Sequence, residues 1–386
     1  MSDLFQRKQV AIRALAASKR DHTGWTDVCT GLDDLPDDMV RAHIDELDME
    51  LDVWPVQLRA APLSWVKRLR IEGREPRLQL CRVLGLGRTT NRDELWRALD
   101  APDVDRIDVL GVEYCGLDEG AMPELARKVA RMGVRQLWLT GNRVGIGIEH
   151  VLRLSCEGIL SSLEAESCGL GKDVLETLVG GGAAIGLREL GLAVNYLKPR
   201  DVEHLVLMPG LDGVRRLNLS GNKFLAPGVR ALVPQAPLYG LRELSLDDTQ
   251  CGDGGAAILA GSTAFARLES LSLMGCLMGD LGAAALAATT SQAALLDLNL
   301  ESNGITAAGV RSLLVSTQLA ALVRLNLMYN QIEDDIVDVL GTCPQVSRLA
   351  SLTLDDTYLS EEARVALRSL PLRAGLLDLH LVHGGA

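Results

Sequence analysis

The chain has few aromatic residues, an excess of acidic over basic residues and no long apolar run, and each shortage excludes a class of protein. Aromatic residues make up 3% of the 386 residues, so leucine, alanine and glycine must build the core in thin layers. Because no run of about 18 apolar residues occurs, we expect no membrane span. The net charge of −12 offers nucleic acid no basic footprint and favours a basic partner instead.

The eight cysteines form no C-x-x-C pair and no metal-like cluster with histidine. We therefore expect buried, reduced thiols, which fits a reducing compartment and a cytoplasmic protein. The N-terminal residues mix charges through a helical pattern and do not predict a signal peptide. Arginine outnumbers lysine 32 to 7, a bias that hints at a GC-rich, bacterial genome.

A repeated apolar block is the strongest signal that is present. The spacing L-x-x-L-x-L-x-x-N/C/T-x-L returns with a period of about 27 residues, and only the step from Val134 to Leu160 is shorter, by one position. A unit this short cannot bury its own apolar face, so the units must stack and share one continuous core. The blocks begin at Ile107, Val134, Leu160, Leu187, Val214, Leu241, Leu268, Leu295, Leu322, Leu349 and Leu376.

Each unit predicts a short strand, a turn and a helix. In Val214–Leu219 the last residues alternate as in a strand with one buried face, and Pro227–Val233 has helical spacing. Strand and helix repeated in this order require parallel strands and right-handed crossovers. The predicted fold is an α/β solenoid with a curved parallel sheet on its inner side and helices outside.

This pattern resembles the leucine-rich-repeat proteins, in particular the ribonuclease-inhibitor-like class. The resemblance rests on L-x-x-L-x-L-x-x-N-x-(I/L) followed by x-x-x-G-x-x-x-L, as in Leu295–Leu313, and covers at least residues 107–386. It implies a horseshoe in which the asparagines at the ninth position form a buried ladder, although the repeat of about 27 residues departs from the slightly longer, often alternating units typical of that class. We interpret all ten ninth-position residues as structural: Cys115, Asn142, Cys168, Asn195, Asn222, Thr249, Cys276, Asn303, Asn330 and Thr357.

The first 106 residues lack the regular pattern. Residues 1–52 are expected to form a helical cap that shields the end of the stack. Residues 53–106 are expected to hold degenerate repeats, because counting back from Ile107 by one repeat gives Leu80 and by a second repeat gives Val53. The elements expected there are helices at Leu4–Lys19, Asp37–Leu47, Ser64–Arg70 and Arg92–Leu99, and strand residues Val56, Leu58 and Val83.

Positions 3, 5, 7 and 8 of each unit are expected to point into the horseshoe or to border it. They carry twelve acidic residues against two arginines, a net charge of −10 compared with −12 for the whole chain. Tyrosine, tryptophan and methionine, which anchor interfaces, lie among them. The predicted partner-binding residues are Glu113, Tyr114, Trp138, Glu164, Glu166, Glu243, Asp247, Asp248, Met274, Asp297, Glu301, Met328, Tyr329, Asp355 and Asp356.

These observations favour a non-catalytic scaffold that binds a basic protein on its acidic concave face. An acidic face that only keeps the sheet soluble is the alternative. We find no enzymatic signature and expect no cofactor: His380-x-x-His383 is incomplete for zinc, and neither Gly180-Gly181-Gly182 nor residues 168–173 form a phosphate loop.

Two other functions remain open, together with a homodimer. By analogy with leucine-rich-repeat GTPase activators, the chain could regulate a GTPase, with Arg143 as the candidate residue. Leu32–Leu51 faintly resembles the opening of an F-box through Leu35-Pro36, which implies a ubiquitin-ligase adaptor, although a capping helix explains it equally well. The strand expected at Leu376–Leu381 leaves an edge through which a second copy could pair.

Overall fold

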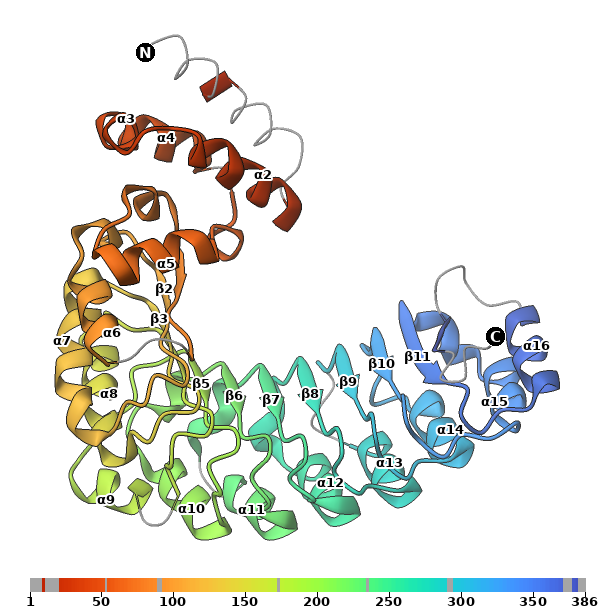
Figure 1. Ribbon diagram of the computed structural model, residues 1–386. Coiled ribbons are helices and arrows are strands. Elements are labelled where there is room, and N and C mark those ends of the chain that lie inside the picture. The colour runs from red at the N-terminus through yellow and green to blue at the C-terminus, as the bar shows by residue number, and fades with distance from the viewer. Residues whose placement is uncertain are drawn as a thin grey trace. The chain divides into compact units, whose positions relative to one another are not determined.

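The computed structural model describes residues 9–10, 21–52, 54–88, 92–171, 174–233, 236–289, 294–370 and 377–380. It consists of two compact units, residues 1–168 and 169–386. In both units short strands alternate along the chain with helices, as the repeat predicts (Figure 1).

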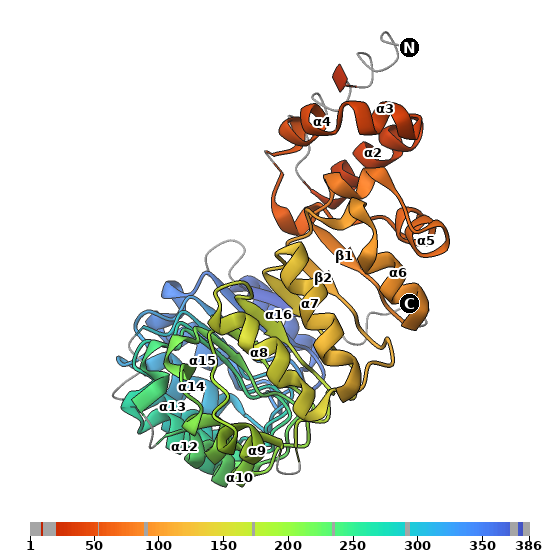
Figure 2. The ribbon, with the colours of Figure 1, turned by 90° about the vertical axis from the view of Figure 1, so that its left-hand side faces the viewer.

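The first unit holds four parallel strands among its described residues, preceded by a group of helices that Figure 2 shows gathered beyond β1. The strands are β1 (Val83–Gly85), β2 (Val109–Gly111), β3 (Gln136–Trp138) and β4 (Ser162–Glu164). The α-helices are α2 (His22–Asp33), α3 (Asp37–Ala42), α4 (Ile44–Leu51), α5 (Leu63–Glu72), α6 (Arg92–Asp100), α7 (Met122–Met132) and α8 (Glu149–Cys156). The 3-10 helices are η1 (Val56–Leu58), η2 (Pro76–Leu80), η3 (Pro102–Val104), η4 (Glu119–Ala121) and η5 (Gly145–Ile148).

The second unit continues the alternation, and Figure 1 shows β6 to β11 in sequential order with α10 to α15 on one side of them. The strands are β5 (Glu189–Gly191), β6 (Arg216–Asn218), β7 (Glu243–Ser245), β8 (Ser270–Ser272), β9 (Asp297–Asn299), β10 (Arg324–Asn326), β11 (Ser351–Asp355) and β12 (Leu377–His380). The α-helices are α9 (Val174–Gly180), α10 (Pro199–Leu207), α11 (Leu225–Leu232), α12 (Gly252–Ala260), α13 (Asp280–Ala287), α14 (Ala307–Val315), α15 (Ile336–Thr342) and α16 (Glu361–Ser369). The 3-10 helices are η6 (Leu211–Gly213), η7 (Ala236–Gly240), η8 (Thr263–Phe265) and η9 (Pro344–Arg348).

Strand register keeps the fourth repeat position in line, so that one row of leucines runs through the strands of each unit. Leu137 pairs with Leu163 across the shortened repeat, and in the second unit Leu217 pairs with Leu244. These leucines are at most 2% exposed. The layers therefore share one apolar core in each unit, and the predicted leucine-rich-repeat solenoid is confirmed.

The ninth-position ladder is also confirmed. The side-chain amide of Asn222 donates to the carbonyls of Leu192 and Leu219 at 2.9 and 2.8 Å, and its oxygen accepts from the backbone N–H groups of Asn195 and Leu197. The asparagine thus pairs with backbone N–H and C=O groups in the turns of its own repeat and of the preceding repeat. Burial would otherwise leave these groups unpaired.

Cysteines take over part of this role at other ninth positions. The thiols of Cys115, Cys168 and Cys276 donate to the carbonyls of Leu86, Leu139 and Leu246, respectively. A thiol replaces one donor of the amide but not its acceptor oxygen. Seven of the eight cysteines are buried, as expected, whereas Cys156 is exposed.

The repeats before residue 107 differ from the prediction in register. Val83 pairs with Val109 and Leu84 with Leu110, which makes this step one position shorter than the regular repeat, so Leu84 and not Val83 takes the fourth position. Val56–Leu58 is a 3-10 helix instead of a strand, because Pro55 lacks an N–H and holds a φ that suits the start of a helical turn. Val53 lies outside the described residues.

The predicted helices at Ser64–Arg70 and Arg92–Leu99 are present as α5 and α6. Asp37–Leu47 is interrupted at His43, where the backbone leaves the helical region between α3 and α4. The prediction at Leu4–Lys19 lies outside the described residues except for two positions.

Helix α2 was not expected, because its two glycines and three threonines are weak helix formers. Tertiary contacts compensate for this composition. Trp25, Val28 and Leu32 are at most 4% exposed, and the Asp21 side chain accepts from the Gly24 N–H at 2.8 Å, which caps the helix.

The last strand is displaced from the repeat. Leu352 pairs with Leu377, whereas the regular repeat pairs it with Leu379. The pairing of β12 is thus shifted by two residues relative to the regular repeat. Residue Leu376 and the segment 381–386 lie outside the described residues.

Candidate functional site

We use the name strand face for the side of the strands that faces away from the helices. It is formed by positions 3, 5, 7 and 8 of the repeats. At the eighth position the backbone is left-handed in nine consecutive repeats, from Tyr114 with φ 53° to Tyr329 with φ 55°. This conformation ends the strand before the ninth-position turn. The strands are therefore short, and the seventh and eighth side chains border the face.

The first-unit patch consists of Glu113, Tyr114, Trp138, Glu164 and Glu166. Trp138 and Glu164 are paired neighbours on β3 and β4, and Glu113 and Glu166 follow β2 and β4. The three carboxylates and Trp138 are half-buried, whereas Tyr114 is 44% exposed. The structure thus brings five predicted residues onto one face of one unit.

An aromatic ring of this patch already contacts a cation. The Arg88 guanidinium lies 4.4 Å from the centre of the Tyr114 ring, within the range of a cation–π contact. The sequence prediction missed Arg88 because this residue precedes the regular repeats. The shortened step between β1 and β2 places it at the eighth position, directly before Tyr114 in the stack.

Glu164 is the electrostatically strained member of the patch. Burial raises the pKa of its carboxyl to about 7, and the negative charge of Glu166 adds to the rise. Its Oε1 atom is buried and accepts no hydrogen bond from any described residue. The carboxyl therefore lacks the donor or cation that would stabilise its charged form.

This raised pKa predicts how Glu164 affects stability. The protonated form stabilises the native state fully below the unfolded pKa of about 4.5, and this contribution is lost as the pH rises through about 7. The free energy of unfolding of Glu164→Gln, relative to that of the wild type, should therefore rise by about 1–2 kcal/mol from pH 5 to pH 8. Urea unfolding at both pH values measures the difference, and a pH-independent difference would contradict the assignment.

In the second compact unit, residues 169–386, the acidic residues at the third position of the repeats form ion pairs with arginines of the same chain. Arg216 contacts Glu189 at 2.8 Å and Glu243 at 2.6 Å, and Arg324 pairs with Asp297. These hydrogen bonds lower the pKa of Glu243 and raise that of Arg216. The predicted negative surplus is therefore smaller on this part of the strand face.

The seventh-position acids are engaged as well. Asp247 accepts hydrogen bonds from the hydroxyls of Ser245 and Ser272 and from the Met274 N–H, and Glu301 accepts from the Asn326 amide. Asp248 remains an exposed carboxylate of this face.

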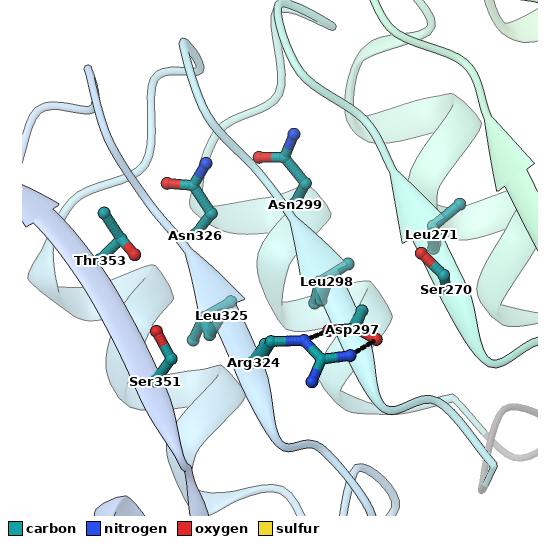
Figure 3. Close-up of a pocket in the computed structure, with 10 residues that line it drawn as sticks. All are labelled: Ser270, Leu271, Asp297, Leu298, Asn299, Arg324, Leu325, Asn326, Ser351 and Thr353. Atoms are coloured by element: carbon teal, nitrogen blue, oxygen red, sulfur yellow. Dashed lines mark hydrogen bonds and ion pairs between the residues drawn. The ribbon is translucent and has the colours of Figure 1, made fainter. Parts of the chain in front are cut away.

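A shallow polar depression of about 310 Å³ lies over β8 to β11 (Figure 3). Asp297 and Arg324 face each other across neighbouring strands on its floor, and Asn299 and Asn326 lie two residues further along the same strands. Because the charged pair is internally matched, the depression presents dipoles more than net charge.

The predicted role of Asp355 and Asp356 as exposed partner-binding carboxylates is wrong. Asp355 is 6% exposed and accepts from the backbone N–H groups of Tyr329 and Thr357, and Asp356 is fully buried with Arg364 3.2 Å away. The reason is that β11 is longer than its neighbours and continues through Asp355, which pairs with His380 of β12. Reversing these charges would disrupt folding instead of testing binding.

The remaining predicted anchors are accessible to different degrees. Met274 and Met328 are half-buried and Tyr329 is 50% exposed. The sequence prediction missed further exposed apolar side chains at the tenth position, which it did not count as part of the face. They are Tyr196, Leu277 and Tyr358, with exposed fractions of 81%, 70% and 56%.

The structure adds little to the other hypotheses. Leu35 is buried, and its carbonyl accepts from Arg77, so Leu35-Pro36 serves internal packing at the start of α3. Arg143 is exposed. Across the described residues, no group of three or more His, Cys, Asp or Glu residues could hold a metal ion. None of the described helices is long and apolar enough to cross a membrane.

Comparisons with known proteins place this architecture in a class. Residues 268–287, 294–314 and 321–341 match the family model described as Leucine Rich repeat. A search of the curated proteins finds no match. With its parallel strands and flanking helices, the chain has the fold of leucine-rich-repeat proteins.

Three solved structures are similar to this chain at low sequence identity. A chain of the Rad7 and Elc1 complex in yeast matches with a TM-score of 0.54 and 15% identity, over 99% of this chain and 94% of that one. An internalin (inlF) of Listeria monocytogenes matches with a TM-score of 0.39 and 18% identity, over 67% and 83% of the two chains. The TLR13–ssRNA13 complex matches with a TM-score of 0.44 and 19% identity, over 79% and 40%.

Proposed function

We propose that this chain is a non-catalytic scaffold whose strand face binds a basic surface of a partner protein. The observation that carries the proposal is the uncompensated charge of the first-unit patch. Within the described part of the chain, none of Glu113, Glu164 and Glu166 forms an ion pair, although many other acids do. Tyr114 and Trp138 supply apolar area beside these charges, a combination found at interface centres.

Electrostatics sets the character of the expected complex. Acidic side chains attract a basic partner over about a Debye length and raise the association rate, and the attraction weakens as salt is added. The aromatic side chains then contribute the short-range contacts that slow dissociation. A cytoplasmic location and the ribonuclease-inhibitor-like subclass remain parts of this proposal.

Quantitative co-purification tests the function. The wild type and the triple variant Glu113→Gln, Glu164→Gln and Glu166→Gln are used as baits under identical salt conditions. A matched control, Glu119→Gln, Glu157→Gln and Glu361→Gln, removes the same charge from residues of the turns and helices. We expect at least one basic protein to be depleted about tenfold or more with the first variant and to be retained by the control. Equal recovery with all three baits would contradict the proposal.

A further inference from the structure

We propose that the first-unit patch is a recognition site for a lysine or arginine side chain of the partner, with Trp138 as the platform and Glu164 as the counter-ion. This inference rests on the proposed function and places its binding energy at one site. It concerns the faces of β1 to β4 only.

Trp138 borders open space on the face of β1 and β2. At the fifth position, β1 and β2 carry Gly85 and Gly111, so these two positions place no side chain beside the indole, and the Oε2 atom of Glu113 lies 3.7 Å from where a Cβ of Gly111 would be. A Cβ on Gly111 would lie 3.3 Å from the Trp138 ring, which shows that the indole leans over this glycine. A Cβ on Gly85 would meet nothing within 4 Å. The ring therefore borders an open floor that an incoming side chain can occupy.

A carboxylate oxygen without a described hydrogen-bond donor borders this open floor. Glu164 is the neighbour of Trp138 on β4, and its buried Oε1 atom has no described hydrogen-bond donor. An ammonium or guanidinium group placed over the indole would supply that donor. It would also favour the ionised form of a carboxyl whose pKa burial raises to about 7.

The same face already holds a cation on an aromatic ring. Arg88 lies over Tyr114, and the two residues occupy the eighth positions of adjacent repeats. Trp138 is the stronger cation–π acceptor of the two ring types and is flanked by carboxylates. The intramolecular pair thus shows the geometry that a partner residue would adopt at Trp138.

The second unit provides an internal comparison. Its third-position acids already contact Arg216 and Arg324, so a partner cation would have to displace an existing ion pair. Such displacement gains little net energy at an exposed site. Charge complementarity therefore favours the first-unit patch.

A titration of the full chain tests this site. The probe is a fluorescein-labelled peptide of alternating arginine and glycine, measured by fluorescence anisotropy at constant ionic strength. Glu164→Gln and Trp138→Leu should each weaken binding about tenfold. The matched variants Asp248→Asn and Tyr329→Leu remove the same charge and a comparable ring from the second unit, and they should change affinity by less than about twofold.

A filling variant guards against unfolding. Gly85→Leu removes no charge and enters open space, so it should fold, retain the wild-type melting temperature and still weaken the peptide several-fold. If the peptide binds the wild type and all variants equally, the site is wrong while the scaffold function stands. If the peptide does not bind the wild type at all, a basic partner for the strand face is itself contradicted.

Discussion

Arg77→Met should lower the free energy of unfolding of the first unit by about 3–5 kcal/mol, because it breaks a buried ion pair. Arg77 and Glu75 are each 2% exposed. The guanidinium contacts Glu75 at 2.8 Å and Asp37 at 2.7 Å, and it also donates to the carbonyls of Leu32 and Leu35. Methionine fills a similar volume but leaves both carbonyls without this donor and Glu75 with less compensation.

The contacts with Leu32, Leu35 and Asp37 connect η2 to the helices α2 and α3 and to the turn between them, so the loss should be greatest at the N-terminal end of the unit. Urea unfolding followed by circular dichroism gives the free energy, and hydrogen exchange locates the change in α2 and α3. Arg127→Met is the matched control, because Arg127 is 75% exposed and pairs only with its helix neighbour Glu124. If both variants change stability by less than about 1 kcal/mol, the buried network does not hold the cap.

Asn222→Ala should cost about 3 kcal/mol or more and should loosen the second unit around β5 and β6. Four backbone groups, at Leu192, Leu219, Asn195 and Leu197, lose their partner, and unpaired buried groups cost about 1–3 kcal/mol each before relaxation. Because a solenoid is stabilised by contacts between neighbouring units, the damage should spread to adjacent layers.

The control for this substitution is Asn218→Ala. Asn218 lies on the strand face, is half-buried and accepts one backbone hydrogen bond, from Ser220 at 3.0 Å. Its removal should cost less than about 1 kcal/mol. Thermal unfolding of the two variants measures the difference, and equal losses would show that the ladder contributes no more than an ordinary surface amide.

The periodicity of the sequence predicts the regular part of the fold because it reports which side chains are buried. The leucine at the fourth position of each repeat fixes the register, so even the shortened repeat between Leu137 and Leu163 is placed correctly. The register of the first strand, β1, could not be predicted in this way. Val83 and Leu84 are both apolar, and the pattern cannot decide which of them pairs with Leu110, whereas the structure selects Leu84.

The candidate site could be predicted only in part, because the sequence lists charges without showing which of them are compensated. Arg216 lies exactly one repeat away from both Glu189 and Glu243, so residues at equal positions in adjacent units could have been expected to pair. The burial of Asp356 carries no such signal, since it depends on Arg364 of the following helix and on the longer strand β11.

Carboxyl footprinting of the purified complex tests whether a basic partner binds the strand face. Carbodiimide labelling of Glu113, Glu164 and Glu166 should fall several-fold when the partner is bound. Glu157 and Glu362, exposed on the helical side, should label at the same rate with and without it. Protection of Glu157 and Glu362 with unchanged labelling of the three strand-face carboxylates would contradict the account.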